Sequence, residues 1–359
     1  ADAPAAQEPA GYGFRYSALT RLMREVIADC GTRLLEKPPH YGCAELRNAI
    51  AEYLLRYRGM LAQPDCIIIG SGAEYLYGLI VQLLGRERIY GLEDPGYEKI
   101  RQVYAANGAV CDLLPMSEDG IRTGALQKTN ASVLHITPFH SFPTGITTSA
   151  AKRSAYLAWA AERNAILIED DFDSEFSENK KPLQTLYSMD RRGCVIYVNT
   201  FSHSLAPSMR MGYMVLPEKL MERYISTMNF YSCTVSGFEQ YAMAAFLEKG
   251  YFERHIRRLL NDYRGQRERI CRMFRESPLS QISQIYQDDA GTHFLLHVRT
   301  ELSDVEIKWA ARQRGILVNC LSEYCFADAQ KYRGILVIHY SDMADEILQK
   351  VIGALEEIF

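Results

Sequence analysis

The sequence predicts an α/β fold: a large domain on a mostly parallel β-sheet with helices on both faces, and a smaller α+β domain. Short apolar runs alternate with stretches of helical periodicity over residues 66–200, which is the pattern of consecutive βαβ units. After about residue 245 a long basic amphipathic stretch precedes shorter apolar runs. The 359 residues are 48% hydrophobic, which suffices for one large domain or two closely packed ones.

The elements of the large domain follow from apolar spacing. A helix is expected over residues 45–60, where Leu46, Ile50, Tyr53 and Leu54 fall on one face. Residues 66–84 and 88–109 each predict a strand, a glycine-containing turn and a helix. A strand then enters a polar loop over residues 132–149, and the helix 150–164 and the strands 165–171 and 194–200 follow. In such sheets ligands bind beyond the carboxyl ends of the strands.

The smaller domain starts with a long helix over residues 251–274. Strands are expected at 292–298, 315–320 and 334–340, and a last helix at 344–359. The basic helix face could bind nucleic acid, but Glu253, Asp262 and Glu268 interrupt it and favour a solvated face. We therefore expect a linker and the N-terminal part of the small domain at 1–40, the large domain at 41–245 and the small C-terminal domain at 246–359.

Composition narrows the class of protein. The net charge of −4 and the pI of about 6.1 do not suggest that this chain binds nucleic acid by itself. Nine scattered cysteines without a CxxC pair indicate reduced thiols in a cytoplasmic protein. No apolar run has the length of a membrane span, and no signal peptide is visible. The Ala/Pro-rich start, residues 1–14, is typical of a linker that another segment precedes, or of a chain cut there.

Unusual side chains follow four of the predicted strands. Ser71-Gly72-Ala73 can bind a phosphate at a helix N-terminus, although a plain helix start gives the same pattern. Asp94-Pro95-Gly96-Tyr97 places an aromatic ring at a turn, for stacking or for packing. Glu169-Asp170-Asp171 needs partners, which could be a cationic ring nitrogen, an arginine or a helix N-terminus. Anion-binding groups surround His203, namely Thr200, Ser202 and Arg210.

Phosphate donors, a stacking ring and an acid for a ring nitrogen together describe a pyridoxal-phosphate (PLP) pocket. Four segments carry a specific resemblance: EDPGY (93–97), HITPFHSFPTG (135–145), LIEDDFDSEF (167–176) and TFSHSLAPSMRMGYMVLP (200–217). In this order they resemble the fold type I aminotransferases, and more narrowly the aminotransferase-like domain of GntR/MocR-family transcriptional regulators. The resemblance covers nearly the whole chain and is strongest between residues 41 and 217.

The resemblance implies a set of phosphate ligands. Gly72 and Ala73 match the positions whose backbone amides bind the cofactor phosphate. Thr200, Ser202 and Arg210 match further phosphate ligands.

The resemblance also implies contacts to the cofactor ring. Tyr97 matches the stacking ring, and Asp170 matches the acid that keeps the pyridine nitrogen protonated, so that the ring accepts electrons. His140 falls near the phenolic edge of the cofactor. Because these folds form homodimers with shared sites, Tyr41 is expected to reach the cofactor of the neighbouring subunit.

Several positions depart from the family. His203 stands where the family has the lysine that forms the Schiff base with PLP; it is either natural or an engineered exchange. Phe172 replaces a tyrosine that hydrogen-bonds the phenolic oxygen. Val337 aligns with an arginine that binds a substrate carboxylate, unless another arginine serves. The turn in residues 40–47 is shorter than the family's usual glycine-containing version.

The favoured interpretation is a sensor domain that binds PLP or an amino-compound effector, with DNA bound only by a winged-helix domain missing from the N-terminal side of this chain. The transaminase chemistry is then weakened or lost, because an imidazole forms no stable covalent bond to PLP. Three alternatives stay open: a working aminotransferase, a lysine-free enzyme that uses pyridoxamine phosphate with His203 as base, and a pseudo-enzyme without a cofactor.

Overall fold

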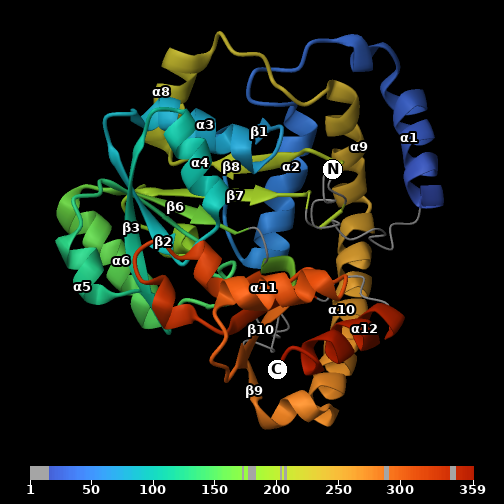
Figure 1. Ribbon diagram of the computed structural model, residues 1–359. Helices are drawn as coiled ribbons and strands as arrows, with labels where there is room; N and C mark the ends of the chain where they lie inside the picture. Colours follow the sequence, from blue (N-terminus) through green and yellow to red (C-terminus); the bar gives the residue numbers. More distant parts are fainter. Residues whose placement is uncertain are drawn as a thin grey trace.

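The computed structural model describes residues 16–171, 174–176, 183–202, 204–205, 208–286, 291–339 and 345–359. The expected linker at residues 1–14 lies outside these ranges. Two sheets organise the described chain, and helices cover them (Figure 1).

The large sheet has the strand order β1-β8-β7-β6-β5-β2-β3-β4. The strands are β1 (Ile67–Gly70), β2 (Ile89–Asp94), β3 (Val110–Ser117), β4 (Gly120–Ile121), β5 (Val133–Ile136), β6 (Ile166–Asp170), β7 (Val195–Thr200) and β8 (Gly212–Val215). From β7 to β3 all neighbours are parallel, whereas β8 runs antiparallel between β1 and β7. The predicted mostly parallel sheet is confirmed; the two-residue β4, antiparallel to β3, makes eight strands where we expected a seven-stranded type.

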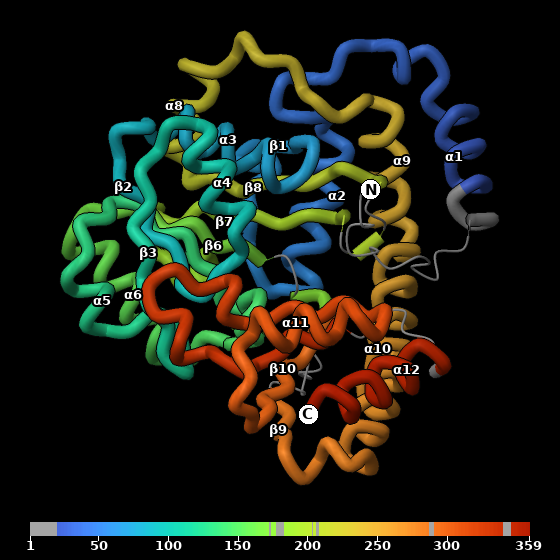
Figure 2. Tube along the Cα trace, viewed as in Figure 1, coloured from blue at the N-terminus to red at the C-terminus, as the bar shows by residue number. Residues whose placement is uncertain are grey.

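Helices connect and cover these strands. They are α1 (Tyr16–Cys30), α2 (Ala44–Tyr53), α3 (Ala73–Leu84), α4 (Glu98–Ala106), α5 (Thr123–Lys128), α6 (Ala150–Arg163), α7 (Leu186–Met189), α8 (Glu218–Met228) and α9 (Gly237–Glu248). In Figure 2, α1 runs beside α9, and Leu22 of α1 belongs to the core of the large sheet. The helix expected over residues 45–60 is α2, which continues as one π-helical turn over Leu54–Arg58.

The small sheet is antiparallel, with the order β11-β12-β10-β9. Its strands are β9 (Ser283–Tyr286), β10 (His293–Val298), β11 (Asn319–Cys320) and β12 (Ile335–His339), packed by α11 (Asp304–Gln313) and α12 (Asp345–Glu356). The long helix α10 (Tyr251–Glu276) joins both halves, since Phe252 packs in the core of the large sheet and Leu259 in the core of the small one.

One strand prediction is wrong for most of its length. Within the run 315–320, only Asn319 and Cys320 pair with β12. The preceding residues end α11 instead: Gly315 has a φ of +72°, and the Ile316 N–H donates to the Ala311 carbonyl oxygen. Apolar content alone did not reveal that this backbone forms the helix end.

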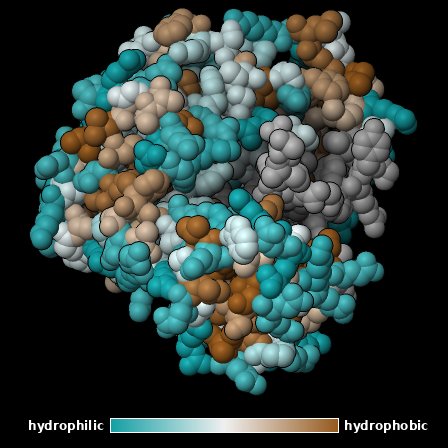
Figure 3. Space-filling view, in the orientation of Figure 1, coloured by the Kyte–Doolittle hydropathy of each residue, from teal (hydrophilic) through white to brown (hydrophobic). Residues whose placement is uncertain are grey.

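The surface of the small sheet carries an apolar area. Val305 and Trp309, one helical turn apart on α11, are 77% and 65% exposed. Figure 3 shows apolar side chains gathered over this part of the molecule. None of the helices in the described ranges is both long and apolar enough to cross a membrane.

Candidate functional site

The topology brings the predicted site residues to one edge of the large sheet. The strands β1, β7, β6, β5 and β2 run in the same direction, so their carboxyl ends lie along one edge. Along that edge follow, strand by strand, Gly72 after β1, Thr200 at the end of β7, Asp170 at the end of β6, His140 after β5 and Tyr97 after β2. Because β8 is antiparallel, Arg210, which precedes it, comes to the same edge. This is where parallel sheets bind ligands.

Asp170 is buried, and one of its oxygens is available to a ligand. Its Oδ2 accepts hydrogen bonds from the Tyr77 hydroxyl and, at 3.2 Å, from Nε2–H of His135. The Tyr104 hydroxyl lies 2.6 Å from His135 Nδ1, which leaves Nε2 as the donor to the carboxylate. Within the described residues, Asp170 Oδ1 has no hydrogen-bond partner although the residue is only 3% exposed. A buried carboxylate oxygen of this kind fits a cationic N–H donor.

Gly72 and Arg210 form the opposite end of the site. Gly72 precedes α3 with a φ of +92° and a ψ of 174°, a conformation that essentially only glycine adopts. A β-carbon there would lie 3.1 Å from Arg210 Nη2, so the guanidinium packs directly on the glycine backbone. The first turn of α3, which starts at Ala73, therefore presents backbone N–H groups and a guanidinium together.

Glu74 bridges the cations at this end. Its carboxylate pairs with Arg210 and, at 3.0 Å, with Lys99. Burial raises the pKa of Glu74, but Lys99 and Arg210 outweigh it and hold this pKa below its usual range. All three side chains are 38–50% exposed, so an incoming anion can exchange with the carboxylate.

The hydroxyls of Thr200 and Ser202 organise the loop that carries Arg210. Thr200 Oγ1 donates to the Met211 carbonyl oxygen at 3.2 Å, and Ser202 Oγ donates to the Met209 carbonyl oxygen at 3.0 Å. The Ser202 N–H in turn donates to Thr200 Oγ1 at 3.2 Å. The sequence suggested anion ligands at both positions; the structure shows them holding the turn on either side of Arg210.

Tyr97 lies at the start of α4 and is 43% exposed. Its ring meets Phe142 edge to face, with centroids 5.7 Å apart. His140, two residues before Phe142, is buried and has a left-handed backbone with a φ of 45°. The polar loop after β5 therefore turns sharply beside the predicted stacking ring.

Tyr41 is held by its own chain. Its carbonyl oxygen accepts from the Ile69 N–H at 3.0 Å, which ties it to β1, and the Arg47 guanidinium lies 4.5 Å from its ring. The role expected for Tyr41 in a neighbouring subunit stays a prediction. His203 and Phe172, two of the expected departures from the family, lie outside the described residues.

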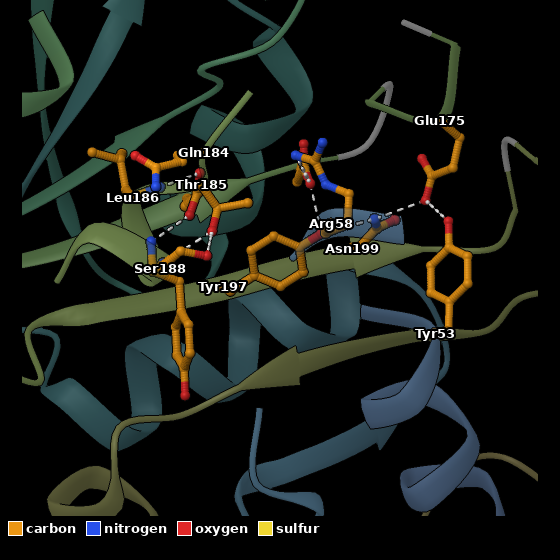
Figure 4. Close-up of polar contacts among 12 residues, drawn as sticks. Tyr53, Arg58, Glu175, Gln184, Thr185, Leu186, Ser188, Tyr197 and Asn199 are labelled. Atoms are coloured by element: carbon orange, nitrogen blue, oxygen red, sulfur yellow. Dashed lines mark hydrogen bonds and ion pairs between the residues drawn. The ribbon is translucent and has the colours of Figure 1, made fainter. Parts of the chain in front are cut away.

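A second polar cluster is buried around Arg58 (Figure 4). Arg58 Nη2 donates to Asp171 Oδ2 at 2.8 Å, and the Tyr197 hydroxyl donates to the same oxygen at 2.6 Å. Asn199 Nδ2 donates to Glu175 Oε1 at 3.0 Å, and Tyr53 approaches the same carboxylate. Burial together with Asp171 raises the pKa of Glu175 to about 7. The cluster thus concentrates negative charge around one arginine.

The two neighbouring acids, Glu169 and Asp171, have partners of different kinds. Glu169 accepts from the Leu186 and Tyr187 N–H groups at 2.8 and 2.9 Å, at the N-terminus of α7. Burial and Asp171 raise the pKa of Glu169 to about 7. From the sequence, an arginine, a helix N-terminus or a ring nitrogen could be the partner of this acidic run. In the structure Asp171 pairs with Arg58, and Glu169 accepts hydrogen bonds from the N-terminus of α7.

Sequence reasoning missed Tyr77, His135, Tyr104 and Glu74. His135 gave a signal that could have been used, since it is a polar residue inside the apolar run of β5. Tyr77 and Tyr104 lie on helices and reach Asp170 and His135 only through the tertiary fold. Glu74 gave no signal beyond an acid in the first turn of a helix.

Comparison with known proteins is consistent with this geometry. Residues 14–355 match the family described as aminotransferase class I and II. The uncharacterized HTH-type transcriptional regulator YdeL of Bacillus subtilis is 32% identical over 85% of this chain and 66% of its own length. The HTH-type pyridoxine biosynthesis transcriptional regulator PdxR of Corynebacterium glutamicum is 31% identical over 80% of this chain and 62% of its own length. The chain thus spans just under two thirds of the length of these curated relatives.

A solved structure shows the same fold. The kynurenine aminotransferase of Pyrococcus horikoshii, crystallised with PMP, superposes with a TM-score of 0.83 at 21% identity, over 98% of this chain and 90% of that one. The resemblance to fold type I aminotransferases and to the aminotransferase-like domains of GntR/MocR-type regulators is confirmed.

Proposed function

Because the chain belongs to the aminotransferase class I and II family, and its curated relatives include HTH-type transcriptional regulators, we propose that it is the sensing domain of a GntR/MocR-type regulator. It binds PLP or an amino-compound effector. DNA binding belongs to a part of the protein outside this chain. The observation that carries the proposal is the buried Asp170 Oδ1, which has no partner among the described residues.

The residues present fit the PLP that this family implies. Asp170 would accept the proton on the pyridine nitrogen, backed by Tyr77 and His135 on its other oxygen. The amides after Gly72 and the Arg210 guanidinium would bind the phosphate, in a cradle that a β-carbon would fill. Tyr97 would cover the ring. PLP, when bound, supplies an aldehyde that reacts with amines and an electron-withdrawing ring.

His203 sets the mode of binding in this proposal. The imidazole cannot replace the lysine amine in a covalent bond to the cofactor, so PLP is held by its phosphate, ring and nitrogen alone, and reversibly. The ligand then shifts the balance between arrangements of a homodimer rather than being turned over. His203 can still act as an acid or base near neutral pH.

Thermal unfolding combined with an exchange assay tests the proposal. We expect PLP at about 100 times its Kd to stabilise the protein by about 2.7 kcal/mol, seen as a raised Tm. We expect no amino-group exchange between an amino acid and a keto acid. Exchange by the purified protein would contradict the sensor function, and an unchanged Tm would contradict cofactor binding.

Gly72→Ala is expected to weaken PLP binding roughly tenfold or more. The φ of +92° strains an alanine by about 1–3 kcal/mol, and its β-carbon would displace the Arg210 guanidinium from the phosphate position. An equilibrium titration with PLP measures the loss. Gly265→Ala on α10 is the matched control, because no atom lies within 4 Å of its new β-carbon; its PLP affinity should equal that of the unchanged protein. Equal PLP affinities of the unchanged protein, Gly72→Ala and Gly265→Ala would show that Gly72 does not contribute to the binding site.

A further inference from the structure

Five rings meet where the small sheet contacts the candidate site. Phe142 is at the centre: its ring centroid lies 5.7 Å from Tyr97, 5.3 Å from Tyr324, 5.2 Å from His293 and 5.6 Å from His339. Tyr97 comes from the large sheet, whereas Tyr324, His293 and His339 belong to the small sheet and the loop beside it. We call these five rings the ring wall.

Aliphatic side chains support the ring wall. Val337 of β12, Leu295 of β10 and Leu321 form a buried cluster, and Phe142 and Tyr324 pack against it. Val337 is 4% exposed and pairs with Leu295 across the two strands. Behind the rings of the wall there is therefore a buried aliphatic cluster.

Polar contacts fix the wall to both sheets. The carboxylate of Asp94 accepts from the N–H groups of Phe326 and Ala327, each at 2.9 Å. The Gly96 N–H donates to the Tyr324 carbonyl oxygen at 3.1 Å. His293 Nε2 lies 3.0 Å from the Pro143 carbonyl oxygen, to which it can only donate. The rings are therefore pre-arranged, which reduces the entropy that a bound ligand would cost.

Two of the five rings of the wall are exposed to solvent. Tyr97 is 43% exposed, and His339 is exposed as well. Burial of part of its ring nevertheless lowers the pKa of His339. The wall therefore offers a ligand aromatic edges and faces.

Among the described residues, the cations that contact rings at or beside the wall are Lys99, Lys331 and Arg101, whose guanidinium lies 4.9 Å from the ring of Phe326. Lys99 Nζ is 5.9 Å from the centroid of Tyr97 and is bound to Glu74 at 3.0 Å. Lys331 is exposed and lies 5.4 Å from the ring of Tyr332, which packs against the outer part of the aliphatic cluster. A carboxylate brought against Phe142 would lose water, and among the described residues no cation lies over the Phe142 ring. An aromatic ring would gain edge and face contacts.

We propose that the ring wall binds the aromatic, uncharged end of an amine whose nitrogen lies at the cofactor. This inference rests on the proposed function, because PLP anchors the amine. The ligand class is an arylalkylamine without a carboxylate, rather than an α-amino acid.

Three stable conjugates of reduced PLP test the ligand class by calorimetry on the unchanged protein: phosphopyridoxyl-phenylethylamine, phosphopyridoxyl-L-phenylalanine and phosphopyridoxyl-methylamine. The first two differ only in the carboxylate, and the third lacks the aromatic end. We expect the phenylethylamine conjugate to bind at least tenfold more tightly than each of the others. Equal or tighter binding of the phenylalanine conjugate would overturn the inference while leaving PLP binding intact. Absence of binding by all three conjugates and by PLP would overturn the proposed function as well.

Substitutions of Phe142 in the ring wall and of Val337 in the aliphatic cluster behind it probe the site directly. Val337→Arg should shift preference toward the phenylalanine conjugate by tenfold or more, and Val337→Leu, which stays apolar, should keep the original preference. If circular dichroism shows that the arginine variant is unfolded, Phe142→Ala tests the inference instead. In this variant the phenylethylamine conjugate should lose its advantage, so that the ratio of its affinity to that of the methylamine conjugate falls toward one. A ratio that stays at its original value would place the aromatic end elsewhere.

Discussion

Asp170→Asn is expected to weaken PLP binding by roughly 10- to 100-fold, because a hydrogen bond to a charged group contributes about 1.5–3 kcal/mol. The substitution keeps the shape and removes the charge that would stabilise a protonated pyridine nitrogen. The amide oxygen of the new side chain could still accept hydrogen bonds from Tyr77 and His135, which bind Oδ2 of the native carboxylate. An equilibrium titration followed by absorbance or protein fluorescence gives both affinities.

The matched control for this prediction is His135→Gln. Its amide can still donate toward Asp170, so PLP affinity should fall much less than in Asp170→Asn. An Asp170→Asn protein that binds PLP as tightly as the unchanged one would show that Asp170 Oδ1 is not the anchor of the ligand.

Asp171→Asn is expected to lower the free energy of unfolding by about 3–5 kcal/mol, although it changes the very next residue. It would leave Arg58, whose side chain is 5% exposed, as a buried charge without its ion-pair partner. Urea denaturation measures the loss, and PLP affinity of the folded fraction should change little, because the Asp171 carboxylate is bound within the cluster of Figure 4.

Asp65→Asn provides the comparison. Asp65 pairs with Arg47 at 2.8 Å, the same distance as in the Arg58–Asp171 pair, but its side chain is 93% exposed. We expect Asp65→Asn to lower the free energy of unfolding by less than about 1 kcal/mol. The double variant Arg58→Met/Asp171→Leu should recover much of the stability lost in Asp171→Asn. If Asp171→Asn and Asp65→Asn lowered the free energy of unfolding equally, burial would not explain how much an ion pair contributes to stability.

The parallel sheet and the edge that carries the site could be predicted from the sequence for a physical reason. Strands buried on both faces are short apolar runs, and their carboxyl ends meet at one edge. Asp170 stood out because it directly follows such a run. The partners of the acids could not be predicted, because Arg58 lies 113 residues from Asp171 and 93 residues separate Tyr77 from Asp170.

The contact between the two sheets could not be predicted from the sequence pattern either. Phe142 looked like one apolar residue in a polar loop, and only the packing of two sheets gathers four rings around it. The shortness of β11 could not be predicted either. The backbone of Gly315 and Ile316 ends α11, so only two residues remain to pair with β12. The exchange expected at His203 stays a prediction, because this residue lies outside the described residues.

The central claim is that this chain keeps a PLP site and has lost covalent attachment. A PLP titration followed by absorbance, on the unchanged protein and on His203→Lys, tests it most directly. We expect both proteins to bind PLP, the unchanged one reversibly, and only His203→Lys to remain yellow after desalting. Failure of both proteins to bind PLP would contradict the account, because the site itself would then be absent.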